Sequence, residues 1–477
     1  MIFNSFLFLW LFPTIFAIYY AVMAIAERTK HSANRIGNYL LITISYGLYM
    51  QWKPEYALVL LGVTAITYFS AIIIENKQAY QSKKLLIYTG AILALLPLLV
   101  FKYTGFITEI LTNVILKDKP NSIEINIIAP IGISFYTFQA VGYLFDVYNK
   151  RIKAERNWWD YMLFVCFFPQ ILSGPISRAQ DLLPQIKSER TFDYSKSVQA
   201  LKWILWGMFV KVVMADRLGI YVDTIFANYD MYSGLTCFFA SICYSLQIYG
   251  DFAGYSLMAM GVARLMGFDL INNFNHPYLA TSITDFWKRW HISLTKWLTT
   301  HVYIAMGGNR CSKLRQYWNI MVTFLVSGIW HGANWTFILW GSIHGIFQII
   351  EKALGLQKCE GNWFVKLSRI IITFLIVNFA WIIFRSPDIF FACGYIVRIF
   401  TDHSLSLYSD FGVTPILFYA SIAVVLIKDI IEEFSEDKMS LLNSKYLFVR
   451  WATYISLLVA ILLCGVLDSG SFIYVNF

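Results

Sequence analysis

The sequence predicts an all-α polytopic membrane protein, and three observations lead to this fold class. Of its 477 residues, 58% are hydrophobic and only 14% are charged, whereas soluble proteins carry about a quarter charged residues. Apolar runs of roughly 20 residues, the length needed to cross a bilayer, recur from end to end. They lack the alternating pattern of membrane β-strands. We expect about 11 to 13 transmembrane or re-entrant helices of this length.

The clearest spans are seven apolar runs: residues 2–26, 56–74, 85–101, 235–262, 317–339, 370–384 and 451–467. The first ends in Ala24-Ile25-Ala26, which resembles a signal-peptidase site. However, no basic residue precedes it, and its apolar run is longer than that of a usual signal peptide. We therefore interpret it as a retained first helix.

The net charge of +9 is distributed as expected for a membrane protein and not for a nucleic-acid-binding one. Basic residues cluster in 28–35, 77–84 and 150–156, just outside apolar runs. These clusters share one side if helices occupy 36–52, 54–74, 85–101 and 126–148, with the loop 102–125 on the other. The positive-inside rule then makes the clusters cytoplasmic and the N-terminus extracytoplasmic. Beyond residue 157 the charges predict no topology.

The whole chain, 1–477, is interpreted as a single membrane-embedded domain. Residues 1–120 and 346–477 are plain apolar runs, which we expect to be scaffold helices. Residues 120–345 mix charged and aromatic residues with prolines and glycines. Broken helices at membrane depth are tolerated only where they are buried in protein or line a wet cavity, so this part is the predicted functional core.

The segment FLVSGIWHGANWTF, residues 324–337, places a titratable imidazole, that of His331, in an apolar run. Such a histidine can simply bond to a neighbouring helix, but an ionisable group at membrane depth is by default a functional hypothesis. Imidazole is also well suited to proton transfer near neutral pH. Gly328 and Gly332 would let other groups approach closely. Candidate substrate-binding residues here are Trp330, Asn334 and Trp335.

A second histidine lies in TDFWKRWHISLTKWL, residues 284–298. Apolar residues follow a 3.6-residue period through this segment, which predicts one amphipathic helix. Its lysines, arginine and tryptophans suit the headgroup interface, yet His291 lies beside the apolar stripe. The alternatives are an interfacial anchor and a helix that frames a polar channel. Candidate substrate-binding residues here are Trp287, Arg289 and Trp290.

Two further segments add candidates. MGGNRCSKLR, residues 306–315, is either an ordinary basic loop or a docking place for a phosphate-bearing donor, with Asn309 and Arg310 as candidates. YSLQIYGDFAGYS, residues 244–256, places Tyr249 and Asp251 in an apolar stretch. An aspartate at membrane depth should be paired or face water. We expect either an ion pair with Arg289 or Arg264, or a place along a substrate path, and the two are compatible.

Several catalytic motifs are absent from the sequence. It contains no P-loop, no nucleophile elbow, no H-E-x-x-H and no glycine-rich dinucleotide fingerprint. The histidines at 291, 331 and 344 do not have a recognised metal-ligand spacing, so we predict no metal site. The seven cysteines are scattered and are interpreted as small buried residues. A proton-handling histidine in a membrane cavity is what remains.

Six segments together resemble, in order and spacing, the membrane-bound O-acyltransferases, and in particular their bacterial alginate O-acetylation-like branch. They are QIYGDFAGYSLMAMGVARLMGF, NNFNHPYLATSITDFWKRWHISLTKWL, YIAMGGNR, SGIWHGANWTFILWG, APIGISFYTFQAVGYLFDVY and FFPQILSGPISRAQDLLPQI. The resemblance is dense over roughly residues 120–345. It implies that His331 is the catalytic histidine and His291 the second characteristic one. It also implies a ring of helices around a central funnel.

The resemblance further implies transfer of an acyl group, most simply acetyl, from a cytoplasmic thioester such as acetyl-CoA. The acceptor would be a hydroxyl reached from the other face of the bacterial cytoplasmic membrane, on a cell-surface or secreted polysaccharide or on an extracytoplasmic acyl-acceptor protein. Donor and acceptor are substrates, and we expect no bound cofactor. A transporter or flippase, a D-alanyl or peptidoglycan acyl transfer subunit, and a purely scaffolding subunit remain alternatives.

The chain departs from the family pattern beside the expected substrate paths. Thr299, Thr300 and His301 stand where relatives often have Arg-Asp-Tyr, and Ala305 stands for a proline. Gly250 and Leu257 replace a phenylalanine and an aspartate, also near these paths. These substitutions concern the identity of the substrate more than the type of reaction.

For the mechanism, we predict that neutral His331 acts as the general base on the acceptor hydroxyl. His291 would orient it or donate to the developing oxyanion. Arg289 and Arg310 are candidates for the phosphates of the donor. Asn334, Tyr249 and Asp251 are candidates for polar groups along the channel. A covalent acyl-histidine relay is the alternative to direct transfer.

Overall fold

All regular elements in the described part of the chain are helices, which confirms the predicted fold class. The computed structural model describes residues 3, 5–29, 32–77, 79–115, 128–435 and 441–467. Six of its helical stretches are long and apolar enough to cross a membrane: Phe6–Arg28, Pro54–Asn76, Gln81–Thr108, Tyr194–Ala227, Trp363–Arg385 and Leu447–Cys464. The predicted first span, 2–26, matches the first of these, with residues 2 and 4 outside the described part.

The chain forms two compact units, each made of two segments. The first unit comprises residues 1–200 and 259–271, and the second comprises 201–258 and 272–477. All three boundaries between the units fall inside the stretch 120–345, and they do not follow the limits that the sequence suggested for core and scaffold. Those limits stay a prediction.

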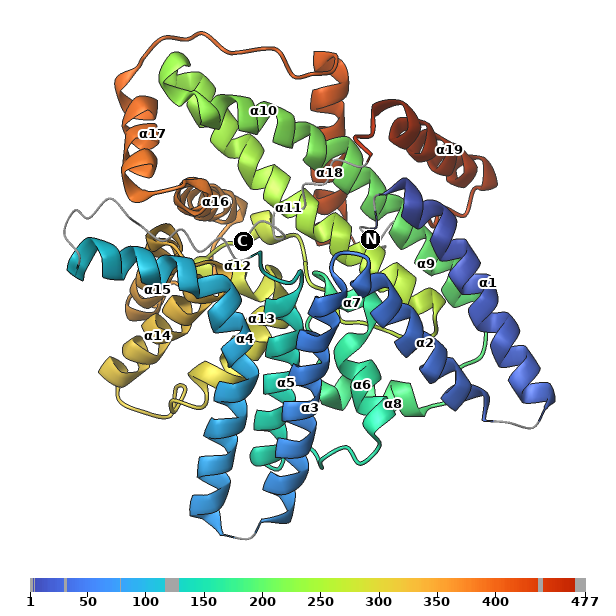
Figure 1. The fold of residues 1–477 in the computed structure, drawn as a ribbon. Helices are drawn as coiled ribbons and strands as arrows, with labels where there is room; N and C mark the ends of the chain where they lie inside the picture. The colour runs from blue at the N-terminus through green and yellow to red at the C-terminus, as the bar shows by residue number, and fades with distance from the viewer. Residues whose placement is uncertain are drawn as a thin grey trace. The chain divides into compact units, whose positions relative to one another are not determined.

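The first unit contains eight complete helices among its described residues: α1 (Phe6–Arg28), α2 (Ala33–Met50), α3 (Pro54–Asn76), α4 (Tyr80–Ile115), α5 (Ile133–Tyr148), α6 (Trp158–Cys166), α7 (Phe168–Ile171) and α8 (Ala179–Lys187). α3, α4 and α5 pack against one another (Figure 1). The predicted helix 54–74 is confirmed by α3. The predicted loop 102–125 is wrong as far as residue 115, because α4 continues through it, and residues 116–127 lie outside the described part.

The predicted helix 126–148 begins later than expected, at Ile133. Pro130 has no N–H to donate, and Gly132 has a left-handed φ of +75°. A Cβ on Gly132 would lie 2.0 Å from the carbonyl oxygen of Ile171. The loop backbone therefore passes close to the end of α7, and only glycine fits there.

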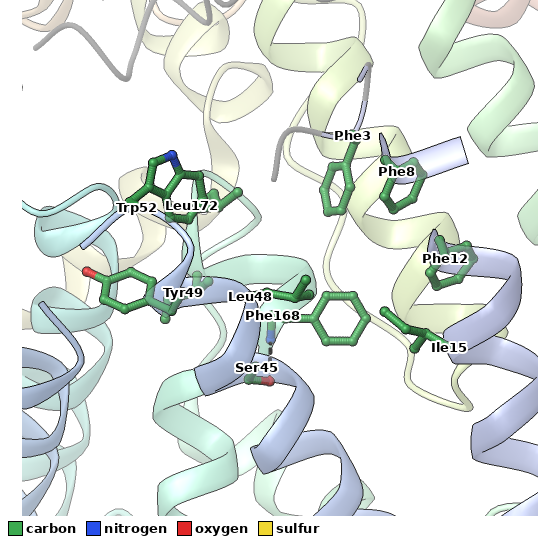
Figure 2. A pocket seen from close by; sticks show the side chains of 11 residues that line it. Phe3, Phe8, Phe12, Ile15, Ser45, Leu48, Tyr49, Trp52, Phe168 and Leu172 are labelled. Carbon is green, nitrogen blue, oxygen red and sulfur yellow. Dashed lines mark hydrogen bonds between the residues drawn. The ribbon is translucent and has the colours of Figure 1, made fainter. Parts of the chain in front are cut away.

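A small pocket of about 20 Å³ lies between α1, α2 and α7 (Figure 2). Its walls are mostly aromatic and aliphatic side chains, including Phe8, Phe12 and Phe168. The hydroxyl of Ser45 also faces it, but that oxygen accepts a hydrogen bond from the Phe168 N–H at 3.1 Å. No histidine, carboxylate or ammonium group of the described residues lines this pocket, and the Tyr49 hydroxyl donates to the Ile131 carbonyl, so we do not interpret it as an active site.

The second unit contains these helices: α10 (Asp216–Ala227), α12 (Ile283–Arg289), α13 (Ile292–Leu298), α14 (Lys313–His331), α15 (Trp335–Ala353), α16 (Trp363–Arg385), α17 (Ile389–Thr401), α18 (Pro415–Phe434) and α19 (Leu447–Cys464). It also contains two π-helices, η1 (Phe209–Ala215) and η4 (Thr299–Tyr303), and the 3₁₀ turns η2 (Tyr229–Met231) and η3 (Pro277–Leu279). α9 (Tyr194–Met208) and α11 (Gly234–Leu265) belong partly to each unit.

The predicted span 317–339 is wrong, because the structure folds it into a hairpin of two helices, α14 and α15 (Figure 1). α14 ends at His331, and Asn334 begins α15 by accepting a hydrogen bond from the Thr336 N–H through its side chain. Gly332 has extended backbone angles between them. A glycine and an asparagine N-cap thus turn the chain within three residues. The mean hydropathy of the segment does not reveal this turn.

Candidate active site

His291 lies where the predicted helix 284–298 breaks in two. α12 ends at Arg289 and α13 begins at Ile292, and His291 between them has a φ of +43°. Non-glycine residues seldom adopt this left-handed conformation, and where they do the surroundings must hold them in it. The single amphipathic helix expected from periodicity is therefore wrong at its centre.

The break is held by the segment around Asn273, which pairs with it through the backbone. The Ile292 N–H donates to the Asn273 carbonyl at 3.0 Å, and the Asn275 N–H donates to the Arg289 carbonyl at 3.0 Å. The side-chain oxygen of Asn273 accepts from the Ser293 N–H, also at 3.0 Å. Backbone donors and acceptors released by the broken helix are thereby satisfied.

Asn273 also determines which nitrogen of His291 carries the proton. Its side-chain oxygen lies 3.4 Å from His291 Nδ1. A carbonyl oxygen only accepts hydrogen bonds, so Nδ1 is the protonated nitrogen in this pairing and Nε2 keeps the lone pair of a base. This imidazole lies between two helices that are too short to span a bilayer. Burial lowers its pKa to about 3, so the ring is neutral at physiological pH.

His331 is the last residue of α14 and lies beside a close approach of α14 and α15. A Cβ on Gly328 would lie 2.3 Å from the Phe337 carbonyl oxygen, and one on Gly332 would lie 2.1 Å from the Phe337 ring. The expectation that these two glycines allow close approach is confirmed. The ring of Phe337 thus covers the turn directly after His331.

The rings of the two histidines both contact the indole of Trp330. Ring centroids are 5.8 Å apart for His291 and Trp330, and 4.9 Å apart for Trp330 and His331. His331 also meets the ring of Trp340 edge-on at 5.0 Å. Both histidines are buried, with 1% and 3% of their surface exposed. The structure therefore brings together the two histidines that the sequence singled out, with Trp330 between them.

A third histidine, His344, belongs to the same aromatic cluster and was not among the candidates from the sequence. It is fully buried, and its Nδ1 accepts a hydrogen bond from the Trp287 indole N–H at 3.3 Å. Its ring lies 5.0 Å from that of Trp340. Its position thirteen residues after His331, on the apolar helix α15, was a signal that it could face the same site.

A cavity of about 280 Å³ lies between α12, α13, η4, α14 and α15, beside this cluster. Its lining combines apolar side chains with hydroxyl, amide and ammonium groups, and we call it the polar cavity after these groups. The lining residues are Thr284, Trp287, Lys288, Thr295, Leu298, Thr299, Tyr303, Ile320, Thr323, Phe324, Ser327, Gln348, Lys352 and Gln357. On α14 they follow one helical face that leads to Ser327, one turn before His331. The predicted residue Trp287 is part of this wall, and neither His291 nor His331 is.

Asp251 has a partner other than those expected. Its carboxylate pairs with Lys211, which also contacts Asp216 at 2.6 Å. All three side chains are buried, and Lys211 lies on the π-helix η1. The predicted pairing of Asp251 with Arg289 or Arg264 is therefore wrong. The lysine was visible in the apolar stretch GMFVKVVMAD, where a buried cation requires acidic partners.

Tyr249 and Arg289 are both bonded to the acidic end of α18. The Tyr249 hydroxyl donates to Asp429 at 2.8 Å. The Arg289 guanidinium donates to Glu433 at 2.7 and 3.1 Å, and to Asp285 at 3.0 Å. Arg289 is thus neutralised by two carboxylates, and the geometry gives no support to its predicted contact with a donor phosphate.

The remaining candidates are divided between the cluster and the surface. Trp290 is buried and its ring lies 5.1 Å from that of Trp381. Asn334 caps α15 and donates to the Pro387 carbonyl at 2.6 Å, so the fold uses both ends of its amide. The side chains outside the cluster are exposed: those of Trp335, at 54%, and of Asn309 and Arg310.

Comparison with known proteins identifies the family. The family model described as MBOAT, membrane-bound O-acyltransferase family, matches residues 154–393, half of the chain. The chain belongs to the membrane-bound O-acyltransferase family. It is 37% identical to the probable alginate O-acetylase AlgI of Pseudomonas aeruginosa, over 82% of this chain and 73% of that protein. It is also 34% identical to the peptidoglycan O-acetyltransferase of Helicobacter pylori, over 82% of this chain and 78% of that protein.

A more distant relative is the teichoic acid D-alanyltransferase of Bacillus subtilis, 27% identical over 68% of this chain and 85% of that protein. The matched family segment contains His291, His331 and every residue that lines the polar cavity. This membrane-bound O-acyltransferase is therefore a multi-pass membrane enzyme, and the transporter, flippase and scaffold alternatives are set aside.

Proposed function

We propose that this enzyme transfers an acetyl group from a cytoplasmic acyl thioester, such as acetyl-CoA, to a hydroxyl of a polysaccharide on the far side of the bacterial cytoplasmic membrane. The chain is 37% and 34% identical to relatives named as O-acetylating enzymes, against 27% for the D-alanyltransferase. That order favours acetyl over D-alanyl as the transferred group. The names of the first two relatives, which specify alginate and peptidoglycan, favour a glycan as the acceptor.

The observation that carries the mechanism is the pair of buried imidazoles around Trp330, beside a polar cavity. His331 takes the proton from the acceptor hydroxyl, and the oxygen attacks the thioester carbon. The C–S bond then breaks, and the sulfur leaves with the proton as a thiol, while the acceptor keeps the acetyl ester. A base whose nitrogen lies within about 2.6–3.2 Å of the hydroxyl oxygen contributes typically 10²–10⁴ in rate. His291, neutral with its lone pair on Nε2, assists His331 in handling this proton.

The polar cavity is the proposed place of the thioester donor. Its volume of about 280 Å³ suits an extended amide-containing chain better than a sugar polymer. Lys288 and Lys352 line it and supply positive charge for phosphates, a role for which Arg289 is poorly placed. The exposed Arg310 remains a candidate for the same role.

The test is a deletion strain that carries wild-type, His331→Ala or His403→Ala protein. Mass spectrometry of surface glycans measures ester-linked acetyl, and an immunoblot measures the enzyme in the membrane. We expect His331→Ala to accumulate but to lose acetylation by at least about 10²-fold. His403 is an exposed histidine in the loop before α18 and serves as the matched control. Normal acetylation by His331→Ala would overturn the mechanism.

Labelled acetyl-CoA added to isolated membranes tests the donor separately. We expect the label to enter the glycan in wild-type membranes and not in His331→Ala membranes. If wild-type membranes still acetylated the glycan but the glycan carried no label, acetyl-CoA would be excluded as the donor. Label in a protein, with none in glycan, would replace the polysaccharide by a protein acceptor.

A further inference from the structure

Ser327 is the hydroxyl of the polar cavity nearest in sequence to His331, and it differs from the others in its hydrogen bonding. The side chain is 1% exposed and lines the cavity. Among the residues that the structure describes, its oxygen has no hydrogen-bond partner. A buried hydroxyl without a partner is unfavourable unless a ligand or water supplies one.

The threonine hydroxyls in the wall of the same cavity all form hydrogen bonds within the protein. Thr323, one turn earlier on α14, donates to the Asn319 carbonyl at 2.7 Å. Thr299 donates to the Thr295 carbonyl at 2.7 Å, and Thr295 donates to the Trp290 carbonyl at 3.3 Å. Thr284 bonds to Glu351 at 3.0 Å. Serine within a helix usually bonds to the carbonyl four residues earlier in this way, so Ser327 is the exception.

The position of Ser327 relative to His331 determines what its hydroxyl can reach. Residues four apart on a helix share a face, with about 5–6 Å between their Cβ atoms. This distance leaves room for a carbonyl group whose oxygen accepts a hydrogen bond from Ser327 while the attacking alcohol is hydrogen-bonded to His331. A donor placed where negative charge develops is the arrangement that stabilises acyl-transfer intermediates.

We propose that the Ser327 hydroxyl donates a hydrogen bond to the carbonyl oxygen of the acyl thioester and strengthens it as that oxygen becomes negative. Ser327 is then a catalytic residue, one helical turn from the base His331 and in the wall of the donor cavity. This inference rests on the proposed function, because it needs a thioester in that cavity.

The experiment measures acetyl transfer from acetyl-CoA in membranes containing wild-type, Ser327→Ala, Ser327→Thr and Ser342→Ala enzyme. We expect Ser327→Ala to lower kcat by about 10²-fold, the effect of removing one such donor, with KM for acetyl-CoA changed by less than about twofold. Such a split indicates an interaction made mainly in the transition state. Ser327→Thr keeps a hydroxyl, and we expect it to recover activity.

Ser342→Ala is the matched control, because Ser342 lies on the other helix of the hairpin and its hydroxyl already bonds to the Ile338 carbonyl at 2.8 Å. Thermal unfolding in detergent distinguishes chemistry from folding, and Ser327→Ala should unfold at the wild-type temperature. Wild-type kcat in Ser327→Ala would overturn the proposal. A loss of kcat matched by a loss of folded enzyme would do so too, because it would make the hydroxyl structural. Activity retained by His331→Ala would instead overturn the proposed function itself.

Discussion

Replacing Gly328 by alanine should separate the two helices of the α14–α15 hairpin. The new Cβ would lie 2.3 Å from the Phe337 carbonyl oxygen and 3.1 Å from its carbon. Ordinary van der Waals contacts of a Cβ begin at 3.4 Å, so the backbones must move apart by about 1 Å. The obstacle is main chain, which cannot rotate away as a side chain does.

The size of the effect follows from two opposing contributions to the free energy of unfolding. Overpacking costs typically about 1–3 kcal/mol, and the rigid obstacle places this site at the upper end. Alanine gains about 1 kcal/mol over glycine in helix propensity. The net expectation is a loss of about 2 kcal/mol. A displacement of about 1 Å at the reacting groups can lower the rate by about 10²-fold, and His331 lies only three residues beyond Gly328.

The assay is thermal unfolding of detergent-solubilised enzyme, together with acetyl transfer per folded molecule. Gly62→Ala is the matched control, since it also lies inside a helix but a Cβ there meets nothing within 4 Å. We expect Gly62→Ala to be slightly more stable than wild type and fully active, and Gly328→Ala to be less stable with about 1% activity. If the two variants behaved alike, the close approach of the helices would not matter and the reasoning would be wrong.

Two other substitutions test how the site is held. Asn273→Ala removes the oxygen that accepts hydrogen bonds from the Ser293 N–H and from His291 Nδ1. We expect turnover to fall about 10- to 100-fold, as for other groups that orient a functional histidine. Unchanged turnover in a folded variant would refute the orientation of His291 by Asn273. Lys211→Met leaves the buried carboxylates of Asp216 and Asp251 without a cation, and removing one partner of a buried pair costs about 3–5 kcal/mol. Its thermal midpoint should therefore fall well below wild type, and a wild-type midpoint would mean that the cluster contributes no stability.

The helix α3 was predictable because one regular pattern determines it. The apolar run 54–74 and the helix Pro54–Asn76 coincide closely, since a single stretch of apolar residues with a proline at its start needs no partner to specify it. The hairpin turn after His331 was partly visible as well. Gly332 and Asn334 are ordinary signals for a helix end and a helix start, but they fall inside a run whose mean hydropathy suggests one continuous span.

The break at His291 could not be predicted from its own segment. Apolar residues keep the helical period through Trp290, and nothing in the sequence around His291 marks an interruption. The conformation depends on Asn273, eighteen residues earlier, whose backbone and side chain replace the hydrogen bonds of a continuous helix. Tertiary contacts of this kind override local propensity, and they do so here at a residue that the resemblance marks as functional.

Some buried polar residues near a site stabilise its structure, and others can take part in its chemistry. The hydrogen-bond partners of each residue distinguish the two kinds. Tyr249 was a candidate because a polar group in an apolar stretch is costly, and Arg289 was a candidate for binding the phosphates of the donor. The structure satisfies both with carboxylates of α18, a helix in the part of the chain expected to be plain scaffold. Ser327 attracted no attention in the sequence, because a serine in an apolar helix usually bonds to its own backbone. Only the structure shows that this hydroxyl, unlike that of Thr323, has no hydrogen-bond partner among the described residues. Because Ser327 lies one helical turn from His331, its hydroxyl can donate to the carbonyl oxygen of a thioester in the cavity, which is the role proposed for it.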